Sequence, residues 1–106
     1  MKDAALILCL LIATASWGAE GEQPSLKRGE ELFKSSHLGT NKKSCDSCHP
    51  GGKGMEVSAG YKEEELAGII NQCIVTPLKG KPLAADSVDM KSLVLYIKSL
   101  AVPARP

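Results

Sequence analysis

Two cysteines and a histidine, Cys45, Cys48 and His49, form the pattern Cys-x-x-Cys-His, which constrains this chain more than any other part of its sequence. Two thiols separated by two residues match the spacing of the vinyl groups of a porphyrin and add across them to form thioethers. The adjacent histidine then lies under the iron and becomes its proximal ligand. The pattern therefore predicts one covalent haem c, attached through Cys45 and Cys48, with His49 as the proximal iron ligand.

Two other kinds of site use the same residue types. A zinc site needs four ligands, and the chain beyond residue 19 offers five candidates, which are His37, Cys45, Cys48, His49 and Cys73. These candidates include no second closely spaced pair. A thioredoxin-like redox pair needs a βαβ unit, and the sequence shows no alternating pattern typical of a strand. The pattern thus favours haem over both alternatives.

The first 19 residues have the layout of a secretory signal peptide, although the cleavage site is ambiguous. Lys2 precedes an apolar run of ten residues, 4–13, and small residues follow it. This run is too short to span a bilayer, which needs about 20 apolar residues. We therefore expect an exported, periplasmic bacterial protein whose mature chain has no transmembrane segment. A retained membrane anchor and a lipoprotein modified at Cys9 are the alternatives. Export agrees with haem attachment, which takes place outside the cytoplasm.

Removal of residues 1–19 would leave 87 of the 106 residues, with a single domain expected over 25–102. Three aromatic residues remain, Phe33, Tyr61 and Tyr96, and so short a chain buries little core of its own. Haem would add apolar surface, at roughly 25 cal/mol per Å² buried. The haem-free chain is therefore predicted to be largely unfolded. A formal charge of +1 gives no electrostatic reason to expect nucleic acid or an anionic membrane as a partner.

Three segments, 25–35, 62–73 and 87–100, have the periodicity of amphipathic helices. Their apolar positions are, in order, Leu26, Gly29, Leu32 and Phe33; Leu66, Ile69, Ile70 and Cys73; and Met90, Leu93, Val94, Ile97, Leu100 and Ala101. Residues 36–60 and 74–85 are rich in glycine and proline and are expected to be irregular loops. The sequence therefore predicts an all-α domain.

The second axial ligand sets much of the redox potential of a haem iron, and the sequence offers several candidates for it. Met55 follows His49 by six residues, which is too close to reach the opposite haem face. His37 and the lysines are expected to be loop or surface residues. Met90 lies on the apolar stripe of the last helix, where core packing explains it better than ligation, and it is kept as the fallback ligand.

Cys73 is the candidate distal ligand. On the apolar face of 62–73, the alternative role for it is that of a small buried hydrophobic residue. Two arguments favour ligation. Once Cys45 and Cys48 are bonded to haem, Cys73 is an unpaired thiol in an oxidising compartment. It also opens the segment that must cover the distal haem face. A thiolate ligand would stabilise the ferric state and lower the potential.

Several stretches within residues 26–101 carry a resemblance to known proteins. They are Gly29-Glu-Glu-Leu-Phe33, Leu38-Gly-Thr-Asn41, Ser44-Cys-Asp-Ser-Cys-His-Pro50, Ile70-Asn-Gln-Cys73, Gly80-Lys-Pro-Leu83 and Ser87-Val-Asp-Met90. The pattern resembles class I cytochromes c, and more narrowly the haem domains of thiosulfate dehydrogenase and of the SoxA-type sulfur-oxidation cytochromes. The resemblance implies a class I cytochrome c fold, with three main helices around one haem. It also implies that the first and last helices cross at Gly29, near Phe33 and Tyr96, and that Cys73 can be the distal ligand.

Three functions are compatible with these features. The preferred one is a monomeric monohaem carrier of single electrons between redox partner proteins, without enzymatic activity. An acidic partner is conceivable, because lysines lie in the two predicted loops at positions 42, 43, 53, 79 and 81, although ordinary solvated lysines would look the same. The second function is a haem module for thiosulfate-type redox chemistry, with Cys73 beside the iron. The resembling enzymes usually have two haem domains or a partner subunit, and this chain has one motif. The third is a sensor with an open sixth iron position.

Overall fold

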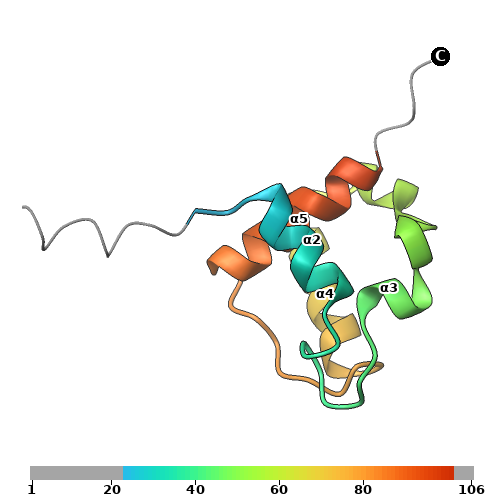
Figure 1. Cartoon of the computed structure of the whole chain (residues 1–106). Coiled ribbons are helices and arrows are strands. Elements are labelled where there is room, and N and C mark those ends of the chain that lie inside the picture. The colour runs from blue at the N-terminus through green and yellow to red at the C-terminus, as the bar shows by residue number, and fades with distance from the viewer. Residues whose placement is uncertain (1–22, 102–106) are drawn as a thin grey trace, which may run out of the picture.

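The computed structural model describes residues 23–101; residues 1–22, which include the predicted signal peptide, and residues 102–106 lie outside the described part. This part is helical and contains no strand (Figure 1), in agreement with the predicted all-α class. Its elements are α2 (Leu26–Lys34), α3 (Cys45–Cys48), η1 (Pro50–Gly52), η2 (Met55–Gly60), α4 (Glu63–Val75) and α5 (Val88–Leu100). Among residues 23–101, no helix combines the length and the apolar character needed to cross a membrane.

The three predicted amphipathic helices are confirmed. Segments 25–35 and 87–100 correspond to α2 and α5, whose first turns are capped by the side chains of Ser25 and Ser87. The middle helix differs at its end. It continues past residue 73 to Val75, so Cys73 lies within α4 and does not close it.

The prediction of an irregular loop over 36–60 is wrong for its second part, where three short helices form. Ser44 and Ser47 cap α3 reciprocally: the Ser47 N–H donates to Ser44 Oγ (3.2 Å) and the Ser44 N–H donates to Ser47 Oγ (2.9 Å). The Asp46 carboxylate accepts the N–H of Gly51 (3.1 Å) and links α3 to η1. These side-chain oxygens accept hydrogen bonds from backbone N–H groups that would otherwise have no partner in this glycine-rich segment.

Helices α2 and α5 cross in close contact at Gly29. A Cβ atom at this position would lie 2.1 Å from the carbonyl oxygen of Ser92 and 2.6 Å from the Cβ of Tyr96. One turn further along α2, the Phe33 ring meets the Tyr96 ring edge to face, with centroids 5.4 Å apart. The crossing implied by the resemblance is therefore present in this structure.

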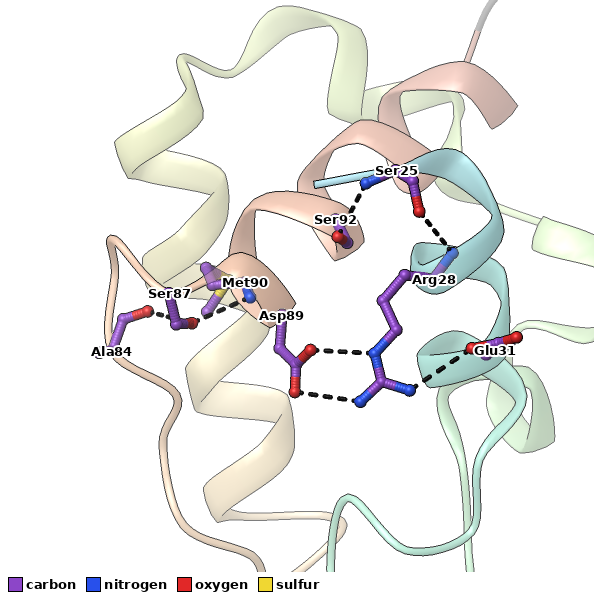
Figure 2. Close-up of polar contacts among 8 residues, drawn as sticks. All are labelled: Ser25, Arg28, Glu31, Ala84, Ser87, Asp89, Met90 and Ser92. Atoms are coloured by element: carbon purple, nitrogen blue, oxygen red, sulfur yellow. Dashed lines mark hydrogen bonds and ion pairs between the residues drawn. The ribbon is translucent and has the colours of Figure 1, made fainter. Parts of the chain in front are cut away.

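Polar contacts fasten the same two helices near their N-terminal ends (Figure 2). The backbone N–H of Ser25 donates to the buried Ser92 Oγ at 3.0 Å. The Arg28 guanidinium contacts both carboxylate oxygens of Asp89, at 3.0 and 3.3 Å, and hydrogen bonding to Asp89 raises the pKa of Arg28. Both side chains are partly exposed, so this pair contributes about 0–1 kcal/mol and serves mainly to fix the orientation of the helices.

The hydrophobic core lies where α2, α4 and α5 meet. Its buried apolar residues are Leu32, Phe33, Leu66, Ala67, Ile70, Ile74, Leu78, Met90, Leu93, Val94, Ile97 and Ala101. The predicted helix faces supply most of them, while Leu78 comes from the loop after α4. Leu26 was predicted to face the core and is 52% exposed, because it stands in the first turn of α2, before the helices cross.

Replacing Gly29 with Ala is expected to destabilise the protein by about 1–3 kcal/mol, because the new methyl group has no room against the backbone of α5. Gly68→Ala is the matched control. Gly68 lies on the exposed side of α4, where a Cβ atom would have no neighbour within 4 Å, so this change should raise stability by roughly 0.5–1 kcal/mol. Thermal unfolding followed by circular dichroism measures both. Equal effects of the two substitutions would contradict the tight crossing.

Candidate functional site

A cavity of about 290 Å³ adjoins the core, between α3, η2, α4 and the loop after α4. Small-molecule sites usually have volumes of roughly 300–1,000 Å³, so this cavity is near the lower end of that range. Apolar side chains dominate its lining, and Phe33, Leu66, Ile70 and Ile97 contribute both to the lining and to the buried core. A largely apolar ligand with few polar groups is the kind of molecule that this surface would hold.

All three residues of the Cys-x-x-Cys-His motif line this cavity. Cys45 and Cys48 begin and end α3, and His49 follows as its C-terminal cap. Residues three positions apart lie on the same face of a helix, so a single helical turn brings both thiols to one side. The reciprocal serine cap described above stabilises this turn, which is too short to persist alone.

The imidazole of His49 is oriented by the backbone. Its Nδ1 atom lies 3.0 Å from the carbonyl oxygen of Lys53. A carbonyl only accepts hydrogen bonds, so this contact assigns the proton to Nδ1 and leaves the lone pair of Nε2 free for a metal. Gly52 and Gly54, on either side of Lys53, have positive φ angles of 84° and 92°, and this turn brings the carbonyl back to the ring. The contact was not predicted from the sequence. The two glycines, which indicate a tight turn after His49, were the only sequence feature that pointed to it.

Partial burial against the apolar lining raises the pKa of two of the cysteine thiols, although neither residue is fully buried. Desolvation is the main cause that raises the pKa of Cys45 to about 11. The pKa of Cys73 is also raised, first by burial and then by the nearby Cys48 thiol. Both groups are therefore protonated at neutral pH in the folded chain. Cys45 and Cys73 both line the cavity, so α3 and α4 bring these thiols to the same region.

Cys73 lines the cavity from α4, together with Ile69 one turn before it. The apolar stripe predicted for this helix is divided between two surroundings. Leu66 and Ile70 are buried in the core, Ile69 is half-buried, and Cys73 is exposed. The alternative role of Cys73 as a small buried hydrophobic residue is therefore wrong.

The other candidate ligands lie in different places. Met90 is fully buried in the core and is not among the residues that line the cavity, so it fits its packing role and does not fit the role of fallback ligand. His37 is exposed and away from the cavity lining. Met55 does line the cavity, from the first turn of η2.

The loop after α4 forms one wall of the cavity through Pro77 and Leu78. It is fastened to the loop that precedes α3. The Thr40 N–H donates to the Leu78 carbonyl at 2.9 Å, and the Asn41 side-chain amide donates to the Pro77 carbonyl at 2.6 Å. At Gly39, a Cβ atom would lie 1.9 Å from the Leu78 carbonyl oxygen, so only glycine permits this approach. These contacts were not predicted from the sequence.

The zinc alternative is not supported by the arrangement of side chains. Among residues 23–101, no group of three or more His, Cys, Asp and Glu side chains could hold a metal ion. The thioredoxin-like alternative lacks its βαβ unit, since the same part of the chain has no strand.

Comparison of the chain with protein-family models, with curated proteins and with solved structures found no match. The site is therefore interpreted from its own residues. Two thiols on one face of a helical turn, an imidazole with Nε2 free and an apolar cavity are the groups that a covalently attached haem requires. The residues present fit that cofactor.

We expect the chain made without haem to be largely unfolded, because the cavity would leave apolar side chains of the core against water. Its three thiols, Cys45, Cys48 and Cys73, should then react with iodoacetamide at the rates of unfolded peptides. Peptide mapping by mass spectrometry at pH 8, with circular dichroism in parallel, measures this. A folded haem-free chain would behave differently. Raising the pKa of Cys45 from 9.0 to about 11 lowers its thiolate fraction about 100-fold, so slow labelling of Cys45 would contradict the expectation.

Proposed function

We propose that this protein is a class I c-type cytochrome that carries single electrons between exported, periplasmic redox partners. One haem c would be attached through Cys45 and Cys48, with His49 as its proximal iron ligand. The observation that carries this proposal is the apolar cavity lined by both thiols and by an imidazole whose Nε2 is free. The arrangement of α2, α4 and α5 around one side of this cavity supports the class I fold.

The haem supplies a reversible one-electron iron couple when it is bound. The residues of the chain fix it and shape its surroundings. The hydrogen bond from His49 Nδ1 to the Lys53 carbonyl holds the ring in one orientation and makes Nε2 a stronger ligand. The apolar lining excludes water, which favours the iron state of lower charge. Electron transfer needs no substrate pocket beyond this, so the site suits a carrier.

The rim of the cavity offers an exit for electrons. Val57 and Tyr61 line the cavity and are 68% and 39% exposed. A haem edge beside them would lie close to solvent, and a partner could approach it directly.

Charge indicates what kind of partner would dock. Lysines are concentrated in the loops before and after the cavity wall, at positions 42, 43, 53, 79 and 81, and all five are exposed. Among residues 23–101, none of them forms an ion pair. Asp46, an acidic residue of α3 close to the first three lysines in sequence, is engaged with the Gly51 N–H. We propose that the redox partner presents an acidic surface to these loops.

The mass and colour of the exported protein test the proposed function. We expect the purified protein to weigh one haem more than its processed polypeptide and to show a low-spin c-type absorption spectrum that changes rapidly and reversibly on one-electron reduction. Cys48→Ala should leave a single thioether or none. A colourless protein with the mass of the polypeptide alone would refute the proposal.

Cys73 is proposed as the distal iron ligand, since it is the thiol on α4 that lines the cavity. Cys73→Ala should change the ferric absorption and electron paramagnetic resonance spectra and raise the reduction potential, because a thiolate stabilises ferric iron. Met90→Leu is the matched control and should leave the spectra unchanged, because Met90 is in the core. Identical spectra for the wild type and Cys73→Ala would show that another group binds the iron.

A second candidate function is favoured by the same thiol. Cys73 is exposed towards the cavity, where a sulfur compound could reach both it and a bound iron. Turnover of thiosulfate or tetrathionate by the purified protein would support sulfur-compound redox chemistry. Fast reduction without such turnover would support the carrier.

A further inference from the structure

The side chain of Asn71 binds the backbone of a residue twelve positions further along the chain. Its amide Nδ2 donates to the carbonyl oxygen of Leu83, and its Oδ1 accepts the N–H of Leu83, both at 2.8 Å. Asn71 and Leu83 are both half-buried. The two bonds satisfy both backbone groups of Leu83 at once, which fixes its position and orientation relative to α4.

The segment between these two residues is a closed loop that carries the cavity wall. Its first half is already tied to the end of α4, because the Leu78 N–H donates to the Cys73 carbonyl (3.2 Å) and the Gly80 N–H donates to the Ile74 carbonyl (2.7 Å). Its second half runs from Gly80 to Leu83 without another hydrogen bond to α4 in the described chain. Asn71 is therefore the contact that holds the far end of the loop.

Helix α4 carries both Cys73 and Asn71, the residue that holds the loop. Pro77 and Leu78 line the cavity beside Cys73, and Asn71 lies two residues before Cys73 on α4. Asn71 is not among the cavity-lining residues, so it would not contact a ligand there. Its effect on the cavity is transmitted through the loop.

We propose that Asn71 is a positioning residue that holds the loop 76–83 against α4 and so fixes the cavity wall beside Cys73. In the proposed cytochrome, on which this inference rests, that wall lies on the side from which an external ligand would replace the distal one. The fixed loop would keep the sixth iron position closed, as a carrier requires. A sensor would need it to open.

Loss of the Asn71 amide should open the loop. In Asn71→Ala, the N–H and carbonyl of Leu83 lose their partners, and open conformations in which both groups meet water are favoured. Asn71→Asp is a milder change. It keeps an acceptor for the Leu83 N–H but places a carboxylate oxygen against the Leu83 carbonyl.

The experiment measures the alkylation of Cys73 by iodoacetamide in the purified native protein, by peptide mapping over time. We expect the rate to rise at least tenfold in Asn71→Ala and less in Asn71→Asp, with faster hydrogen exchange confined to residues 77–83. If the protein carries haem, the rate of imidazole binding to the ferric iron should rise in the same order. Gln72→Ala, an exposed neighbour on α4, should change none of these rates.

A second control separates positioning from general loss of stability. Ser92→Ala removes a hydrogen bond to Ser25 at the α2–α5 contact, away from the loop, and should lower the unfolding temperature without raising the alkylation rate of Cys73. Equal acceleration in Ser92→Ala and Asn71→Ala, or no acceleration in either Asn71 variant, would overturn the proposal. The mass of the purified protein tests haem attachment separately. A protein without haem would refute the proposed function, whereas a haem-bearing protein in which neither Asn71 variant accelerates alkylation or hydrogen exchange would refute only the role of Asn71.

Discussion

The contact of α2 with α5 at Gly29 is the constraint on which the rest of the structure depends. Because the two backbones approach without an intervening side chain, Phe33 and Tyr96 can stack edge to face one turn away. Phe33 and Ile97, one from each helix, then form part of the cavity lining. A wider separation of these helices would displace Phe33 and Ile97, which line the same cavity as the Cys-x-x-Cys-His turn.

Helix α4 connects the core with the candidate site. Leu66 and Ile70 are buried in the core and also line the cavity, while Ile69 and Cys73 line it from a more exposed position. A protein of this size can form little core of its own. Sharing one helix between core and cavity lets a bound group complete the packing that the chain begins.

The sequence was sufficient for the parts of the fold that depend on periodicity and for the residues of the cysteine–histidine motif. The apolar spacing located α2, α4 and α5, and the Cys-x-x-Cys-His pattern located three residues that prove to line one cavity. Hydrogen bonds between a side chain and a backbone group elsewhere in the chain could not be predicted from the sequence. His49 binds the Lys53 carbonyl, and the Asn71 amide binds the Leu83 carbonyl. Such contacts cannot be recognised from residue types, because every residue has a backbone carbonyl. Leu26 shows a related limit, since periodicity gives a face but not which part of that face meets another helix.

The distribution of charge along α4 has a consequence for motion in solution. Three glutamates, 63–65, stand in its first turn, and exposed lysines at 79 and 81 follow its last turn. The helix is 13 residues long, so the two groups are separated by roughly 18 Å at 1.5 Å per residue. These charges form a dipole along α4, with its positive end at the loop that carries Lys79 and Lys81. The field of an acidic surface would exert a torque on this dipole and turn the lysine-bearing loops towards that surface before contact. Dissolved salt would weaken this torque over a Debye length of about 8 Å.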